Sequence, residues 1–355
     1  MFKFPRVNKE IVTVMVAGIV MGTLGVYLAY MGNPRNSGIC ISCFMENLAG
    51  ALNLHGNARM QYIRPELIGF VIGGTMAATL SREFKVEGGS SFFVRFLAGV
   101  LLILGCSIFM GCPIKMELRF AAGDLTVLSG VAGLIFGIWL GYLFLKRGFY
   151  LGEANPMPLI NGLMTPLLMV LFLVLLLSKP NFISTSLTGP GAQKAPLLIS
   201  LGSGLLIGYL AQRSRFCVTG GIGNFIVSGD KTLLSGLVTM LIFSVMASLY
   251  LGQFHFGIEG QPGSHLSYGW SFLGMALVGI TSIMIGGCPF RQLILASQGS
   301  ADAGVTVLGM VAGGAVVQGW GITSSNLGPT HAGKMATLMG LTFILAVGLI
   351  MRQRD

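Results

Sequence analysis

The feature that most constrains the fold is a series of apolar segments, each long enough to cross a membrane. A membrane-spanning helix needs about 20 mainly apolar residues, within a range of about 17–25. Ten such segments are present, with 65–81 and 196–212 at the short limit, so the sequence predicts about ten transmembrane helices. These segments are 11–31, 65–81, 92–111, 124–145, 159–177, 196–212, 232–252, 267–287, 303–320 and 332–351.

The composition agrees with a chain surrounded by membrane lipid. Hydrophobic residues make up 53% of the sequence and charged residues only 10%, whereas a soluble domain carries about 25% charged residues. The 53 glycines suit packed membrane helices, where small residues let backbones approach closely. The net charge of +10 comes from Lys and Arg residues that stand singly between apolar runs. Because no basic patch forms, the sequence excludes nucleic acid as a partner.

Four further apolar segments are too short to span a membrane. They lie between the long segments, at about 38–54, 113–122, 217–228 and 289–298. An apolar segment of about 10–14 residues is typical of a re-entrant or interfacial helix. Non-helical backbone at membrane depth is stable only where protein or a watery cavity satisfies its polar groups. We therefore expect four short re-entrant helices inside the protein.

An internal repeat relates the two halves of the chain. Three pairs of motifs recur in the same order, at offsets of 180, 176 and 177 residues, which indicates an ancient duplication. The paired motifs are T-V-L and V-A-G at 126–133 and 306–313, G-C-P at 111–113 and 287–289, and Cys40 with Asn47 against Cys217 with Asn224.

The duplication predicts two membrane repeats, 1–178 and 179–355, in one integral membrane domain. Each repeat holds five long segments and two short ones. Because an odd number of spans reverses the direction of the chain, the second repeat is expected to insert upside down, as in many transporters. The predicted fold class is an all-α polytopic membrane protein with inverted repeats and an hourglass shape.

Lys and Arg residues indicate the orientation in the membrane. With ten spans and the N-terminus in the cytoplasm, thirteen Lys and Arg residues fall on the cytoplasmic side and seven on the other side. Positive charge gathers on the cytoplasmic side of membrane proteins. The N-terminus and the C-terminus are therefore both expected to be cytoplasmic.

The duplicated Gly-Cys-Pro motif carries the clearest chemical prediction. Proline favours the first position of a helix, which places Cys112 and Cys288 at helix N-caps, beside free N–H groups and the positive end of the helix dipole. Such a site attracts anions. Lys115 and Arg291 follow three residues after the cysteines, near the same helix face. A cation at membrane depth costs about 2.5–3.5 kcal/mol, so its presence in both repeats suggests that it binds a negative substrate. The alternative is that the cations reach the headgroups and the cysteines only pack.

Other polar and sulfur-containing residues have less specific patterns. Cys40 and Cys43 form a C-x-x-C motif, but no second motif completes a zinc site, so we expect no metal. Cys106 is expected to pack inside its span. Asn47 and Asn224 either line the substrate pathway or bond free backbone groups. The four histidines show no ligand spacing and are expected in loops or at interfaces.

Motifs of common enzymes are not found. The sequence has no P-loop, which argues against ATP-driven transport by this chain. It has no G-x-S-x-G nucleophile motif either. We therefore expect a protein that is not an enzyme, with no catalytic residues and no cofactor.

At these residues the chain resembles the YeeE/YedE sulfur-transport family of bacterial inner-membrane proteins. The resemblance covers nearly the whole chain and includes the duplicated cysteine segments. It implies import of sulfur-containing ions such as thiosulfate through an hourglass whose central cysteines lie on short helices. The implied central thiols are Cys112, Cys217 in R-F-C-V-T-G-G, and Cys288.

A narrower resemblance is to the YedE subgroup that is proposed to transport selenium. It rests on G-I-C-I-S-C-F at 38–44, A-G-A-L at 49–52 and Q-Y-I-R-P-E at 61–66. The Cys40–Cys43 motif departs from the thiosulfate-type pattern, which leaves thiosulfate and a selenium species both open as the substrate.

The leading hypothesis is a permease that imports a sulfur- or selenium-containing anion, passed along the central thiols. The residues expected to line the pathway are Cys112, Cys217, Cys288, Cys40, Cys43, Lys115, Arg291, Asn47 and Asn224. A small cytoplasmic sulfur-carrier protein is a further expected partner. The alternatives are a transmembrane thiol–disulfide electron conduit and a covalent persulfide or selenium relay. An electron conduit needs cysteines in disulfide geometry, with Cα atoms about 4.4–6.8 Å apart.

Overall fold

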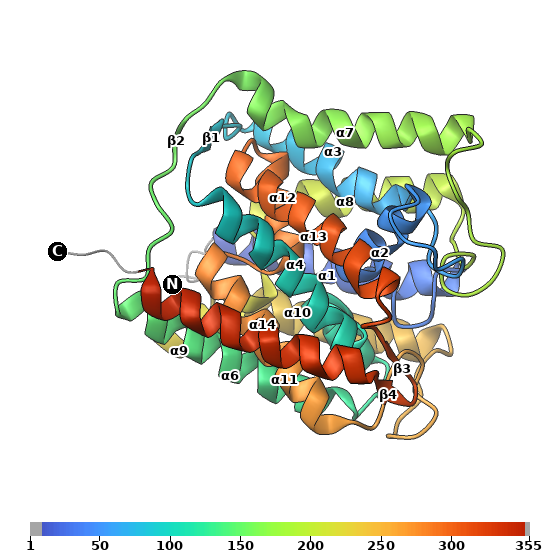
Figure 1. Cartoon of the computed structure of the whole chain (residues 1–355). Coiled ribbons are helices and arrows are strands. Elements are labelled where there is room, and N and C mark those ends of the chain that lie inside the picture. Colours follow the sequence, from blue (N-terminus) through green and yellow to red (C-terminus); the bar gives the residue numbers. More distant parts are fainter. Residues whose placement is uncertain (1–8, 352–355) are drawn as a thin grey trace, which may run out of the picture.

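The computed structural model describes residues 9–351, which form an all-α protein with two very small sheets (Figure 1). The described residues contain fourteen helices. The ten longer ones are α1 (Lys9–Tyr30), α3 (Pro65–Leu80), α4 (Phe92–Phe109), α6 (Val127–Lys146), α7 (Leu159–Ser178), α8 (Leu197–Ser214), α10 (Thr232–Tyr250), α11 (Tyr268–Ile285), α13 (Ala301–Gly319) and α14 (His331–Ile350).

Four short helices lie between the longer ones. They are α2 (Ile41–Ala51), α5 (Pro113–Ala121), α9 (Val218–Ser228) and α12 (Pro289–Ser297). Strand β1 (Glu87–Gly88) pairs antiparallel with β2 (Asn155–Pro156), and β3 (Ser324–Ser325) with β4 (Gly328–Pro329). All fourteen helices occur where the sequence predicts a long or a short apolar segment, so these helix positions are confirmed.

Eight stretches of helix are long and apolar enough to cross a membrane, among the residues that the structure describes. Two of them are 30-residue stretches, in which α4 continues into α5 and α11 into α12. Helix α3, with 16 residues, is shorter than this limit, and α8 is not among the eight. The protein is therefore a multi-pass membrane protein, and spanning by α3 and α8 remains a prediction.

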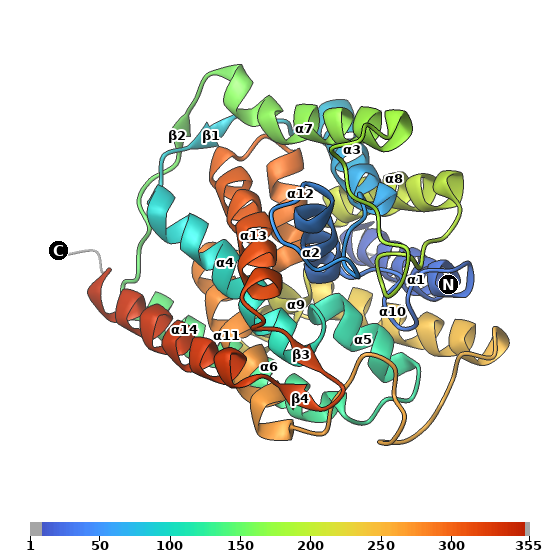
Figure 2. The ribbon, with the colours of Figure 1, turned by 45° about the vertical axis from the view of Figure 1, so that its right-hand side comes forward.

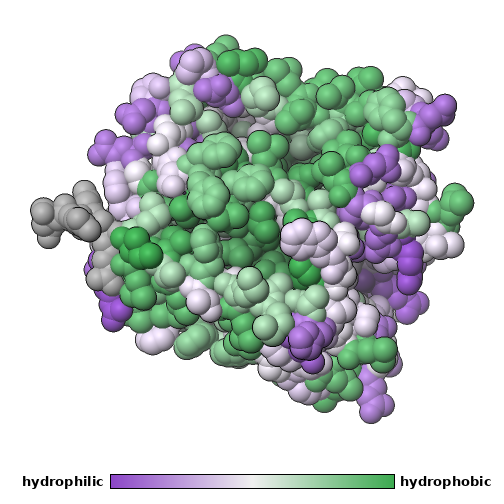
Figure 3. All heavy atoms as spheres, viewed as in Figure 1, coloured by the Kyte–Doolittle hydropathy of each residue, from purple (hydrophilic) through white to green (hydrophobic). Residues whose placement is uncertain are grey.

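Figure 3 shows a broad hydrophobic band across the middle of the molecule, with hydrophilic residues gathered toward its left and right ends. Helix α7 contributes to the apolar surface, since Leu167, Leu171 and Val174 are each about half exposed. In water such a surface would be unstable, but the hydrocarbon of a membrane can cover it.

Glycines lie in the contacts of eight of the ten long helices, which form four close pairs: α1 with α10, α3 with α8, α4 with α13, and α6 with α11. A Cβ atom at Gly18 of α1 would lie 2.1 Å from the backbone oxygen of Gly236 in α10, so only glycine permits this approach. Successive glycines along one helix face successive turns of its partner, which means that the two helices of each pair run parallel.

Helices α4 and α11 pack against each other in opposite directions. Gly105, near the end of α4, lies beside Gly274, near the start of α11. Arg95, near the start of α4, donates a hydrogen bond to the backbone oxygen of Ile285 at the end of α11. These two helices are the equivalents of one another in the sequence repeat, since each leads into Gly-Cys-Pro.

The loops gather on two opposite faces of the molecule. Face A, on the right in Figure 1, carries 31–40, 52–64, 179–196, 251–267 and 320–330. There Arg64 donates hydrogen bonds to the backbone oxygens of Pro190 (2.7 Å) and Gln193 (2.9 Å). Face B, on the left, carries 81–91, 147–158 and 298–300, where the backbone of Lys85 bonds to that of Gln298.

Candidate functional site

Each of the four short helices begins at a cysteine. Cys40, Cys112, Cys217 and Cys288 are the N-cap residues of α2, α5, α9 and α12. The prediction that Cys112 and Cys288 are N-caps is confirmed, with proline at the first helical position in both cases. Cys40 and Cys217 are N-caps that sequence reasoning missed, because no proline follows them.

The four N-cap thiols differ in what they bond. The sulfurs of Cys40 and Cys217 accept hydrogen bonds from the backbone N–H groups of Cys43 (3.4 Å) and Gly220 (3.3 Å). The thiols of Cys112 and Cys288 do not cap their helices. Two thiols therefore complete a helix end, and two are left to interact with other groups.

The four N-cap thiols lie in two pairs, and both members of a pair come from the same half of the chain. The Cys217 and Cys288 sulfurs are 3.8 Å apart, and the side chain of Cys112 neighbours that of Cys40. All four cysteines are buried and none forms a disulfide. The structure thus brings Cys217 and Cys288 together and places Cys112 beside Cys40. Grouping of Cys112, Cys217 and Cys288 in one cluster remains a prediction.

The two cations fold back over the glycine that precedes each cysteine. A Cβ atom at Gly111 would lie 2.7 Å from the side chain of Lys115, and one at Gly287 would lie 2.6 Å from that of Arg291. The ammonium of Lys115 lies 4.0 Å from the Cys43 sulfur. The Nη1 atom of Arg291 is buried without a hydrogen-bond partner among the described residues. Both cations therefore lie beside the start of a helix whose N-cap residue is a cysteine.

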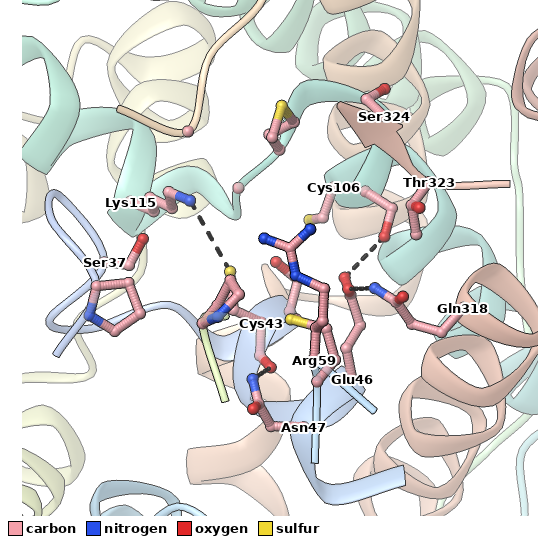
Figure 4. A pocket seen from close by; sticks show the side chains of 18 of the residues that line it. Ser37, Cys43, Glu46, Asn47, Arg59, Cys106, Lys115, Gln318, Thr323 and Ser324 are labelled. Carbon is pink, nitrogen blue, oxygen red and sulfur yellow. Dashed lines mark hydrogen bonds between the residues drawn. The ribbon is translucent and has the colours of Figure 1, made fainter. Parts of the chain in front are cut away.

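A cavity of about 840 Å³, which we call the vestibule, opens on face A (Figure 4). Its wall combines parts of α2, α4, α5 and α13 with the face A loops. Cations outnumber carboxylates among its charged lining residues, which are Arg35, Arg59, Arg64, Lys115 and Glu46. The vestibule is therefore suited to an anion.

Three of the predicted pathway residues line the vestibule. They are Cys43, Asn47 and Lys115. The Asn47 amide donates to the backbone oxygen of Cys43 (2.7 Å), while its Oδ1 is buried without a partner among the described residues. Asn47 therefore bonds the backbone of its own helix and lines the vestibule, and its place on a substrate pathway remains a prediction. Asn224 instead accepts a hydrogen bond from the Tyr142 hydroxyl (3.4 Å).

Glu46 is a vestibule residue that sequence reasoning missed. Its carboxylate accepts a hydrogen bond from the Ser107 hydroxyl of α4 (2.7 Å) and a short one from the Gln318 amide of α13 (Figure 4). The available signal was an acidic residue within a short apolar segment, because an ionisable group at membrane depth is usually functional.

Cys106 and two histidines support the walls of the site. Cys106 is fully buried, as expected of a packing residue, and its side chain also lies at the vestibule wall. His55 and His265 are buried in loops and bond the backbone oxygens of Glu46 (2.9 Å) and Ile108 (2.7 Å). Burial lowers the pKa of the His265 imidazole, and the Arg119 guanidinium acts in the same direction.

Within residues 9–351, no group of three or more His, Cys, Asp and Glu side chains could hold a metal ion. The functional groups that the described site offers are thiols, helix N-termini, cations and one buried carboxylate. Helix N-termini and cations bind anions, and thiols contact soft atoms.

The fold and site define a multi-pass membrane protein with buried thiols beneath a cationic vestibule. Residues 213–353 match the model of the Sulphur transport family (Sulf_transp), so this part of the chain is similar to that family. The match includes α9 and α12 with Cys217 and Cys288. It confirms the family resemblance for these residues but does not resolve a subgroup. No curated protein matches the chain.

Proposed function

We propose that the protein is a permease that imports a sulfur- or selenium-containing anion, such as thiosulfate or a selenium oxyanion, along its central thiols. The observation that carries this proposal is the vestibule, whose charged lining residues are four cations and one carboxylate, with Cys43 beside Lys115 in its wall. The similarity to the Sulphur transport family supports the substrate class.

The proposed route runs from the vestibule through two thiol pairs. An anion that passes the vestibule cations reaches Lys115 and Cys43, which lie at the first turns of α5 and α2. Cys40 and Cys112 come next, followed by Cys217 and Cys288 near Arg291. Thiols can donate weak hydrogen bonds and contact a soft sulfur or selenium atom, while the helix N-termini attract the negative charge.

An inverted relation between residues 1–178 and 179–355 is part of the proposal. In the repeat, α1 is equivalent to α8, α3 to α10, α4 to α11 and α6 to α13. The packed pair α1 and α10 is therefore equivalent to the packed pair α8 and α3, and the pair α4 and α13 is equivalent to the pair α11 and α6. The antiparallel packing of the equivalent helices α4 and α11 supports inversion. In an inverted hourglass, α2 and α5 enter from face A and α9 and α12 from face B. Figure 2 shows α2, α5 and α12 surrounded by longer helices.

We place face B in the cytoplasm, and the protein in a bacterial inner membrane. The cytoplasmic charges Arg82, Lys85, Lys146 and Arg147 lie in or beside the face B loops. The prediction also counted four cytoplasmic charges that lie outside the described residues, namely Lys3, Arg6, Arg352 and Arg354. A small sulfur-carrier protein that receives the substrate would then meet face B.

An uptake assay tests the function. Cells that lack their own importers are given the chain and then radiolabelled thiosulfate, selenite or sulfate. We expect accumulation of thiosulfate or selenite above that of cells with an empty vector, and little sulfate, because sulfate presents only hard oxygen atoms. If none of the labelled anions accumulated while the protein reached the membrane in normal amount, the proposal would be wrong.

A thiol–disulfide electron conduit is the second candidate, favoured by the 3.8 Å separation of the Cys217 and Cys288 sulfurs. In a conduit, a dithiol on one side is oxidised to a disulfide, and its two electrons and two protons reduce a disulfide on the other side. Proteoliposomes distinguish the two functions. Reduction of an enclosed disulfide by an external dithiol, with no anion accumulation, would favour the conduit.

A further inference from the structure

Glu46 lies inside the vestibule in a setting that the proposed anion route does not use. Its side chain is 6% exposed and lines the cavity near its thiol-bearing end. Within residues 9–351, no Lys or Arg forms an ion pair with it. Its two oxygens are instead held by uncharged groups, the Ser107 hydroxyl and the Gln318 amide.

The charged and titratable groups around Glu46 come from three helices and from the face A loops. They are Lys115 from α5, Cys40 and Cys43 from α2 itself, Cys106 from α4, His55 from the loop after α2, and Arg35, Arg59 and Arg64 from the face A loops. The lining residues from α13 and its following loop are uncharged.

The equivalent positions in the second half carry no polar cluster. At the offsets that relate the repeated motifs, Glu46 corresponds to Gly223, Ser107 to Ile283 and Gln318 to Ile138. Ile138 and Ile283 are buried in the contact between α6 and α11. The carboxylate and its two hydrogen-bond partners therefore occur only in the face A vestibule. The repeated fold does not require them, because the equivalent positions of the other half are apolar.

A negative Glu46 would repel the anion that the rest of the vestibule attracts. Burial without a paired cation favours the neutral form of a carboxyl group, and a nearby anion favours it further, since like charges at close range disfavour ionisation. The Ser107 hydroxyl can either donate or accept a hydrogen bond, so its contact with Glu46 persists in both protonation states.

We propose that Glu46 is the proton-binding residue of the vestibule, so that an anion enters from face A together with one proton. The proton comes from the solution at face A, is held on a Glu46 oxygen while the anion occupies the vestibule, and returns to solution or moves on with the anion when it leaves. This inference rests on the proposed function, because it concerns binding of the same substrate class.

Calorimetric titration of thiosulfate into the reconstituted full chain tests the inference. Titrations in buffers with different heats of ionisation count the protons taken up for each anion bound. We expect the parent protein to take up close to one proton in the pH range where the free carboxyl is ionised. Its thiosulfate affinity should fall by up to about tenfold per pH unit across that range, as linkage of one proton requires.

The Glu46→Gln variant keeps the shape and the hydrogen bonds of the neutral carboxyl. We expect it to bind thiosulfate with an affinity that changes less than about twofold over the same range, with no proton uptake, because the titrating group is gone. Glu46→Asp retains a carboxyl and should still take up a proton. Glu83→Gln is the matched control, since Glu83 is a half-exposed carboxylate at face B that pairs with Arg213; it should behave as the parent.

The outcomes separate this inference from the proposed function. Absence of anion binding by the parent at every pH overturns both. Binding by the parent without proton uptake overturns the role of Glu46 alone, whether or not the variants fold. Proton uptake that persists in Glu46→Gln also overturns it, because the titration then belongs to His55 or to one of the thiols.

Discussion

The two thiol pairs share one backbone plan and differ in their surroundings. In both halves a glycine precedes the cysteine, a proline starts the short helix, and a cation folds back over the glycine. The first-half pair, Cys40 and Cys112, lies next to the polar vestibule residues Cys43 and Lys115. For the second-half pair, the position of Cys43 is taken by Gly220. The C-x-x-C motif is therefore a feature of the vestibule and not of the backbone plan that the two halves share.

The site is built from a part that both halves share and a part that only one half has. The duplicated backbone supplies helix N-termini, and these are present in both halves. Side chains from α4 and α13 add polar groups to the vestibule, whereas their counterparts in α11 and α6 are apolar. If this is correct, changes in the shared part should affect both halves alike, and changes in the added part should affect events at face A alone.

Buried ion pairs at the two faces give the largest expected effect. The Arg119–Asp124 pair near face A is almost fully buried at 2.7 Å, while the Arg95–Asp302 pair near face B is partly exposed at 3.5 Å. Asp124→Asn leaves the Arg119 charge buried and should cost about 3–5 kcal/mol of stability. Asp302→Asn should cost about 1.5–3 kcal/mol. Melting temperatures of the purified proteins measure both, and an equal loss would contradict the difference in burial.

Replacement of the central thiols should produce the next largest effect. Serine keeps a similar size and can still cap a helix, so Cys112→Ser, Cys217→Ser and Cys288→Ser should fold. Each removes the polarisable sulfur and should lower thiosulfate or selenite uptake by about a hundredfold, which corresponds to about 2.7 kcal/mol. Cys106→Ser, at the vestibule wall, should have only a mild effect. Parent-like uptake in all three variants, at equal membrane levels, would return the cysteines to a packing role.

The positions of the helices could be predicted because they depend on local sequence. Apolar runs of the required length define the ten long helices, and the proline after Cys112 and after Cys288 defines two N-caps. Every long helix begins and ends within three residues of its predicted segment. The repeat could be predicted as well, because three motifs recur at nearly constant spacing.

The parts of the site that were not predicted from the sequence depend on contacts between residues that are distant in the chain. The hydrogen bonds of Glu46 come from Ser107 and Gln318, which are 61 and 272 residues away. The vestibule also requires the loops of both halves to meet at face A, as Arg64 does with Pro190. Such contacts leave no local pattern. The N-caps at Cys40 and Cys217 lacked a signal for another reason, since a cysteine without a following proline is not typical of a helix start.

The two cations should show a smaller effect that differs in kind. Lys115 lines the vestibule, so Lys115→Gln should raise the KM for uptake about fivefold, equivalent to about 1 kcal/mol of lost attraction. Arg291 does not line the vestibule, and Arg291→Gln should instead lower the maximal rate. Uptake measured over a range of anion concentrations separates the two quantities. The same change in KM for both variants would show that the two cations are equivalent, which would contradict a vestibule role for Lys115 alone.

The glycines of the shared plan should give the smallest effect, and they test it most directly. Both approach the stem of a cation, but the contacts differ. At Gly111 an added Cβ would lie 2.7 Å from the Cδ atom of Lys115, far along a flexible chain, and 3.2 Å from its Cβ atom. At Gly287 it would meet the Cγ and Cβ atoms of Arg291 at 2.6 and 2.8 Å, and a Cβ atom cannot move without its backbone.

We therefore expect Gly111→Ala to reduce uptake by less than about twofold and Gly287→Ala to reduce it by about threefold, because only the second must displace the helix or force Arg291 into another rotamer. Gly202→Ala is the matched control, since a Cβ atom there would meet nothing within 4 Å, and alanine favours a helix over glycine. If both substitutions reduced uptake no more than Gly202→Ala, the cations could not depend on the glycines for their position. The shared plan would then consist of the cysteine and proline alone.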